Sequence, residues 1–249
     1  MRSVRNAVGA AGIVLMLVAG CAETPDPSGS SPDETASDVA GDNSTLSDRV
    51  LYTRVSLAAM RVRTVHLRGV IRVKARTVRM DMRIDLGSKA FTATVEEVGV
   101  GVFDVVGTGS EVYLKGDAGT WSRTNRELAE RLTDKYVRLP SDSPLVTEPD
   151  RIKDLADMRE LAEAVRDGER HRDAEVDGRR MIVLGGHDDT LGDMLLYIPA
   201  EGIALPARMT VGEGADTGIT LDWLDFDQPV VARRPDPDRI VELAPGQRV

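Results

Sequence analysis

The residue with the clearest chemical potential is Cys21, because it is the only cysteine in the 249-residue chain. Two small residues, Ala19 and Gly20, precede it and allow a peptidase groove to hold the backbone closely. Two arginines open the chain, and an uncharged, largely apolar stretch follows them. This order is typical of a secretory signal peptide, and the apolar stretch is too short to span a bilayer. The sequence therefore predicts a signal peptide over 1–20 and a thiol at Cys21 that can be acylated.

The segment Val18-Ala19-Gly20-Cys21 resembles the lipobox of bacterial lipoproteins. That resemblance implies cleavage before Cys21, a diacylglyceryl thioether on its sulfur, and often a third acyl chain on the new N-terminus. The alternative is an ordinary signal peptide with an incidental cysteine, although a lone cysteine in an exported chain then lacks a partner. Two acyl chains anchor a protein stably. We therefore expect a lipid-anchored protein on the extracytoplasmic face of the cell membrane.

The three histidines are candidate metal ligands. His187 lies in Gly185-Gly186-His187-Asp188-Asp189, and an imidazole beside two carboxylates can bind zinc. No second cysteine or histidine lies at ligand spacing, and the segment is more typical of a hairpin loop. His66 falls on the charged face of a predicted strand, and His171 falls in a solvated run of charged residues. We expect no metal site and no cofactor.

Other patterns with catalytic potential are weak. Asp222, Asp225 and Asp227 lack the glycine and the distal glutamate of a calcium loop, which favours the polar side of a strand. The glycines form neither a dinucleotide-binding nor a phosphate-binding loop, and there is no nucleophile elbow. Acids alternate along the strands so often that a pair of carboxylates says little about acid–base catalysis. The sequence favours a binding protein over an enzyme.

The charge of the chain limits its partners. The formal net charge is −9, which argues against a nucleic-acid partner because such proteins need a basic surface. It also argues against tight binding to an anionic membrane, so we expect the lipid, rather than charge, to hold the protein there. Once Cys21 is acylated no thiol remains, and the chain must fold without disulfides in an oxidising compartment.

Composition divides the chain into four parts. The signal peptide over 1–20 is followed by a segment over 21–45 that is rich in proline, serine and acids and has no lysine or arginine. Such a segment buries too little apolar surface to fold, which predicts a disordered tether. A domain is expected over 46–232, and prolines indicate an irregular tail over 233–249.

Within the domain, alternating residues predict an antiparallel sheet with one apolar and one charged face. The clearest strand has five alternating apolar residues, and the next strand continues their face. If a ligand binds, these side chains are the predicted contacts: Val78, Met80, Met82, Ile84, Leu86, Phe91 and Val95. Flexible methionines suit a surface for varied apolar shapes, although ordinary core packing explains them as well.

Helices and turns interrupt the strands. Helical spacing predicts helices over about 47–61 and 150–166. Thr124 to Glu127 has the sequence of a capping box that opens a short helix. Asp177-Gly178 between extended segments predicts a tight hairpin turn, because both positions need positive φ. The fold class that follows is α+β: a single curved antiparallel sheet, or half-barrel, with helices covering its concave face.

The order of these features resembles the LppX/LprG-type lipoproteins (LppX_LprAFG) of high-GC Gram-positive bacteria, within the broader LolA/LolB-like fold. Besides the anchor, tether, first helix and meander, the resemblance rests on short motifs in order: Val112-Tyr113-Leu114-Lys115, Trp121, Lys135-Tyr136-Val137, Asp177-Gly178-Arg179, Leu196-Tyr197-Ile198, Gly202, Leu205-Pro206 and Leu221-Asp222-Trp223. It implies a half-barrel that carries a lipid, glycolipid or acyl chain. This chain departs from the pattern in its low aromatic content, so valine, leucine and methionine would line the cavity.

Two hypotheses about function remain. The first is a membrane-anchored carrier that binds, and can transfer, a lipid or other hydrophobic ligand in the half-barrel. The second is a module of the same fold without a cavity ligand, which recognises or regulates a protein of the cell envelope. A connected apolar space of about 300 Å³ or more would favour the first.

Overall fold

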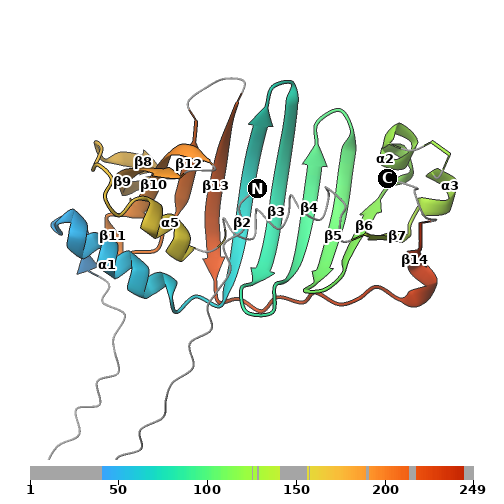
Figure 1. The fold of residues 1–249 in the computed structure, drawn as a ribbon, viewed down its shortest axis with the longest axis horizontal. Coiled ribbons are helices and arrows are strands. Elements are labelled where there is room, and N and C mark those ends of the chain that lie inside the picture. The colour runs from blue at the N-terminus through green and yellow to red at the C-terminus, as the bar shows by residue number, and fades with distance from the viewer. Residues whose placement is uncertain are drawn as a thin grey trace, which may run out of the picture. The chain divides into compact units, whose positions relative to one another are not determined.

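A computed structural model describes residues 41–124, 126–127, 129–140, 156, 158–188, 191–212 and 217–243. The chain from Asp38 to Val249 forms a compact unit of its own. Within the described residues, twelve strands form one curved, open sheet in the order β14-β7-β6-β5-β4-β3-β2-β13-β12-β10-β9-β8 (Figure 1). The expected α+β class and the large curved antiparallel sheet are confirmed.

The sheet consists of two meanders that meet where β2 pairs with β13, the last long strand. The first meander is built from β2 (Thr64–Val73), β3 (Arg76–Asp85), β4 (Ala90–Glu97), β5 (Gly101–Thr108), β6 (Val112–Gly116) and β7 (Tyr136–Leu139). The second is built from β8 (Ala174–Val176), β9 (Arg179–Asp188), β10 (Gly192–Pro199), β12 (Arg208–Val211) and β13 (Thr217–Phe226). Neighbouring strands within each meander are antiparallel.

Two short pairings extend the fold beyond the expected limits of 46 and 232. At one end, β1 (Gly41–Asp42) pairs with β11 (Glu201–Gly202) in a small separate sheet. At the other end, β14 (Ile240–Val241) pairs with β7 in parallel, so the large sheet is not purely antiparallel. The side chain of Asn43 is buried and donates to the carbonyl oxygen of Pro199 at 2.9 Å. These contacts attach both chain ends of the domain to the sheet.

The helices lie toward the two ends of the sheet rather than evenly across it (Figure 1). They are α1 (Asp48–Ala59), α2 (Ala118–Thr124), α3 (Ala129–Leu132), α5 (Met158–Ala164) and the 3₁₀ helix η1 (Pro237–Arg239). Helix α1 packs on α5, which contacts β9, whereas α2 contacts β5 and β6. The expected helix over 47–61 corresponds to α1, and α5 falls within the one expected over 150–166, of which 150–155 lie outside the described residues.

The expected capping box at Thr124 is wrong, because Thr124 ends α2 instead of opening a helix. The competing cap is Asp117, whose carboxylate accepts the backbone N–H of Thr120 at 2.6 Å. This bond lowers the pKa of Asp117, since it stabilises the ionised carboxylate. Asp117 therefore caps α2, a helix that the sequence did not indicate, whereas the short helix predicted after Glu127 corresponds to α3, which begins at Ala129.

The Asp177-Gly178 turn is confirmed. It joins β8 to β9, and both residues have positive φ, 52° and 76°. Two successive residues of positive φ match the twist of the flanking strands, which is why this dipeptide favours a tight hairpin.

Candidate functional site

One apolar face spans the middle of the sheet. It is formed by alternate residues of four neighbouring strands, β13, β2, β3 and β4, and all of its members are buried. We define this apolar face by Leu67, Met80, Met82, Ile84, Phe91, Leu221 and Trp223. Register places these side chains together, because Met82 lies opposite Leu67 on one side and Ala93 on the other.

The residues predicted to contact a ligand fall on this face or at its margin. Met80, Met82, Ile84 and Phe91 belong to the apolar face, whereas the other three, Val78, Leu86 and Val95, are half-buried. Leu86 and Val95 pack against the core from its edge. The structure thus brings six of the seven predicted residues onto the adjacent strands β3 and β4 and Leu86 into the turn after β3, and their contact with a ligand stays a prediction.

The apolar face has glycine positions that let larger neighbours close over it. Gly69 lies between Met80 and Leu221, and a side chain there would overlap the end of Leu221. Gly107 lies opposite Phe91, whose ring occupies the space that a side chain at Gly107 would need. Because Gly69 and Gly107 have no side chains, the neighbouring leucine and phenylalanine side chains, together with the methionines, form the apolar face.

Two tryptophans bring unpaired polar atoms into this apolar environment. Trp223 on the apolar face and Trp121 on α2 are both buried, and neither indole N–H has a hydrogen-bond acceptor in the structure. The Trp121 ring packs edge-on against Phe103, with ring centroids 5.6 Å apart. A buried donor without an acceptor costs about 1–3 kcal/mol.

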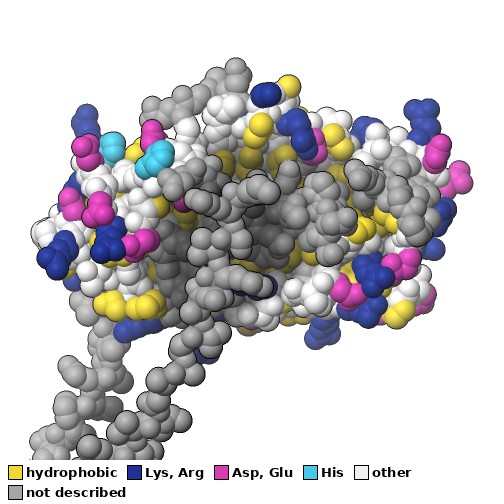
Figure 2. Space-filling view, in the orientation of Figure 1, with side chains coloured by type: hydrophobic (Ala, Val, Ile, Leu, Met, Phe, Trp, Pro, Cys, Tyr) yellow, Lys and Arg dark blue, Asp and Glu magenta, His cyan; other side chains and the backbone are white. Residues whose placement is uncertain are grey.

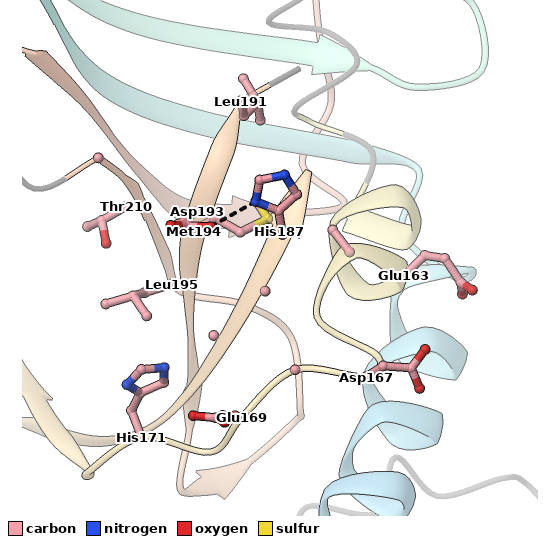
Figure 3. Close-up of a pocket in the computed structure, with 15 residues that line it drawn as sticks. Glu163, Asp167, Glu169, His171, His187, Leu191, Asp193, Met194, Leu195 and Thr210 are labelled. Carbon is pink, nitrogen blue, oxygen red and sulfur yellow. Dashed lines mark hydrogen bonds and ion pairs between the residues drawn. The ribbon is translucent and has the colours of Figure 1, made fainter. Parts of the chain in front are cut away.

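A groove of about 960 Å³ lies elsewhere, between α5 and the strands β9 and β10 (Figure 3). Its lining mixes a few apolar side chains, such as Met194 and Leu195, with charged ones, and it includes none of the seven predicted ligand residues. Glu163 and Asp167 point away from the two strands in Figure 3. The groove is larger than the apolar space that a carrier needs, but its polar lining does not suit an acyl chain.

The groove also holds two of the three histidines, and it gives no metal site. His187 Nδ1 lies 2.8 Å from Asp193 Oδ1 on the paired strand, and both side chains are exposed. His171 lies apart from this pair in Figure 3. Among the described residues, no group of three or more histidine, cysteine, aspartate or glutamate side chains could hold a metal ion.

The expected loop around His187 is wrong, because residues 185–188 belong to β9 and pair with β10. Close packing explains two glycines in this region, Gly186 and Gly168. A side chain at Gly186 would overlap the backbone of Ala164, and one at Gly168 would overlap the carbonyl of Gly185. Glycine is therefore needed where the end of α5 approaches the strand.

The groove holds one carboxylate with a shifted pKa. Glu163 accepts hydrogen bonds from Tyr52 of α1 and from Arg166, and these bonds lower the pKa of Glu163, the bond from Tyr52 most. Arg166 also lies over the Tyr52 ring, 5.9 Å from its centroid. An ionised, paired glutamate of this kind joins α5 to α1 and is not suited to act as a general acid.

On the opposite, charged face of the sheet, His66 has a more specific setting than the sequence indicated. It is buried, with Nε2 2.8 Å from Asp81 and Nδ1 3.0 Å from Asp225. Arg68 and Arg83 lie near the same two carboxylates. The alternating pattern correctly placed His66 on the charged face. Its contact with a second carboxylate depends on a register shift between Trp223 and Asp225 in β13. This cluster links three strands and lies on the face opposite the apolar one.

Two other expectations concern the membrane. Cys21 and the signal peptide lie outside the described residues. In the part of the chain that the structure describes, no helix is long and apolar enough to cross a membrane.

The fold of this chain has similar solved structures. The structure is similar to LprF from Mycobacterium bovis, with a TM-score of 0.52 and 13% identity over 76% of this chain and 96% of that one. It is equally similar to the Mycobacterium tuberculosis lipoprotein LppX, with a TM-score of 0.52 and 14% identity over 75% of this chain and all of that one. No known family and no curated protein matches the chain by sequence. The predicted resemblance is therefore confirmed at the level of the fold.

Proposed function

We propose that this chain is a membrane-anchored lipoprotein on the extracytoplasmic side, and that it binds a lipid or other hydrophobic ligand on its apolar face. The anchor is the predicted thioether at Cys21, and the fold is the one shared with LppX, which is itself a lipoprotein. We further propose that the protein has no catalytic role, since His66 and His187 pair with aspartates and Glu163 accepts from Tyr52, and these groups do not converge on a common site.

The single observation that carries the proposal is the buried indole N–H of Trp223 on a wide apolar face. In a face that served only as protein core, the indole N–H would stay without an acceptor, which is unfavourable. A lipid supplies a partner for each part of the face. Its acyl chains pack against the methionines and leucines, and an ester or hydroxyl oxygen accepts the hydrogen bond of the indole N–H. Because the side chains of the apolar face are buried, a lipid reaches them only when the packing around the face opens.

The test is the lipid content of the protein purified from membranes of the cells that make it. Mass spectrometry of the organic extract should detect bound lipid in the wild type, and Trp223→Phe should reduce the amount while the far-UV circular dichroism stays native-like. Tyr113→Phe is the matched control, because this buried hydroxyl already donates to Glu111 at 2.7 Å. Absence of lipid above the level of an unrelated envelope protein would contradict the carrier and favour the protein-binding alternative.

A further inference from the structure

Helix α1 has an outer face that differs from the rest of this acidic protein. Its inner face packs into the core through Leu51, Val55 and Ala59. Three large apolar side chains on the other side remain exposed: Val50 at 48%, Leu57 at 51% and Met60, just after the helix, at 60%. Helical spacing of 100° per residue puts these three within one third of the helix circumference. The helix therefore has a second apolar stripe that no part of the described structure covers.

The stripe is flanked by positive charge. Residues 49–63 contain four arginines and no acid, in a chain of net charge −9. Arg49 and Arg61 flank the exposed apolar side chains on the helical wheel, and both are exposed. The acids nearest in sequence are engaged, because Asp48 lies 3.7 Å from Arg170 and Asp42 accepts from Ser44. Figure 2 shows hydrophobic and basic side chains together at the lower left, where α1 lies in Figure 1.

The chain enters the domain beside this helix. Pairing of β1 with β11 holds Gly41 and Asp42, and Asn43 accepts a hydrogen bond from Arg54 of α1 at 3.0 Å. Only 20 residues, from 21 to 40, separate the predicted anchor from this point. A coil of that length has a mean extent of about 25 Å, comparable to the ~18 Å length of α1. The anchor thus keeps α1 close to the bilayer surface.

We propose that the outer face of α1 docks on the anionic surface of the membrane that holds the anchor, with Val50, Leu57 and Met60 entering the interface and Arg49 contacting lipid phosphates. An apolar stripe between arginines is the pattern of an interfacial helix. Basic side chains near an anionic surface attract it, and the tether raises the effective concentration of the helix there. The docking rests on the proposed anchor for its location, and it gives the anchored domain a fixed orientation.

The test places an environment-sensitive dye on α1. The chain from residue 22 to 249 contains no cysteine, so Met60→Cys provides a single labelling site. Val98→Cys is the matched control, because Val98 is 50% exposed and its backbone N–H donates to Thr77, which pairs with Arg72 at the end of β2 remote from α1. Both proteins carry an N-terminal hexahistidine tag and are held on vesicles that contain a nickel-chelating lipid. The tag replaces the acyl anchor, so the result does not depend on acylation of Cys21 or on bound lipid.

On vesicles with about 30% phosphatidylglycerol, the dye at position 60 should shift to shorter wavelength and the dye at position 98 should not. Phosphatidylcholine vesicles should give a weaker shift, and Arg49→Glu should reduce binding of the untagged chain to anionic vesicles by about fivefold or more. Equal shifts at both positions, or none at position 60, would overturn the proposal. A shift at position 60 that grows with protein concentration without vesicles would instead assign the stripe to a second copy of the chain.

Discussion

Replacing Met82 by arginine tests whether the apolar face holds a ligand or is solid core. Met82 is 1% exposed and lies in the middle of the face, between Leu67 and Ala93 on the neighbouring strands. In a solid core the guanidinium would be buried without a partner, which costs about 3–5 kcal/mol. For a domain of this size, that loss lowers the melting temperature by roughly 10–15 °C or prevents folding.

If a lipid occupies the space against the face, the outcome differs. The arginine then displaces the lipid and reaches water through the vacated space, so we expect the protein to lose its lipid while its melting temperature falls by only a few degrees. Circular dichroism melts and mass spectrometry of the extracted lipid measure the two effects on one sample. Met82→Leu, which conserves volume, should keep both lipid and stability within about 1.5 kcal/mol.

A second control separates the centre of the sheet from its end. Leu114 is buried on β6, which α2 contacts. Leu114→Arg should therefore unfold the protein whatever the central face binds. A Met82→Arg protein that melts like the wild type and retains its full lipid load would refute the assignment of the face, both as ligand surface and as core.

Three further predictions concern the Asp177-Gly178 turn, the loss of stability at low pH and the lipid anchor. Gly178→Val should destabilise the fold by about 1 kcal/mol or more, because a β-branched residue resists the φ of 76° at this turn, and an unchanged melting temperature would exclude the strain. The bond from Thr120 lowers the pKa of Asp117, so its contribution is present above the unfolded pKa and is lost as the pH falls through the lowered, folded value. Asp117→Asn should accordingly flatten the decline of melting temperature below about pH 4, and a wild-type slope in this variant would count against it. Cys21→Ser should leave the fold intact but abolish metabolic labelling with fatty acid, and continued labelling would rule out the predicted lipobox.

Much of the fold could be predicted because its long strands alternate strictly. Within β3, residues alternate between buried and half-buried positions from Met80 to Ile84, as the sequence indicated. The positive φ values of Asp177 and Gly178 follow from local turn chemistry. By contrast, β1, β11 and β14 have two residues each, and two residues carry no periodicity. Their pairing depends on tertiary contacts such as those of the Asn43 side chain.

The candidate site was less predictable, because its informative features need contacts between distant strands. Alternation places Met80, Met82 and Ile84 on one face, but no pattern shows that the Trp223 N–H lacks an acceptor. The contact between His66 and Asp225 joins residues 159 apart and depends on a bulge, which leaves no trace in the apolar pattern.

The position of β13 has a consequence for how the apolar face forms. Strands β2, β3 and β4 are joined by short turns and can pair soon after they are made, whereas β13 pairs with β2 across a separation of about 150 residues. Local hairpins form before such distant pairings because closing a long loop costs more entropy. Leu221 and Trp223 therefore join the face last, beside the already paired Leu67 and Gly69. A ligand that contacts both Met82 and Trp223 bridges the two meanders, and it should stabilise the β2–β13 junction more than any other part of the sheet.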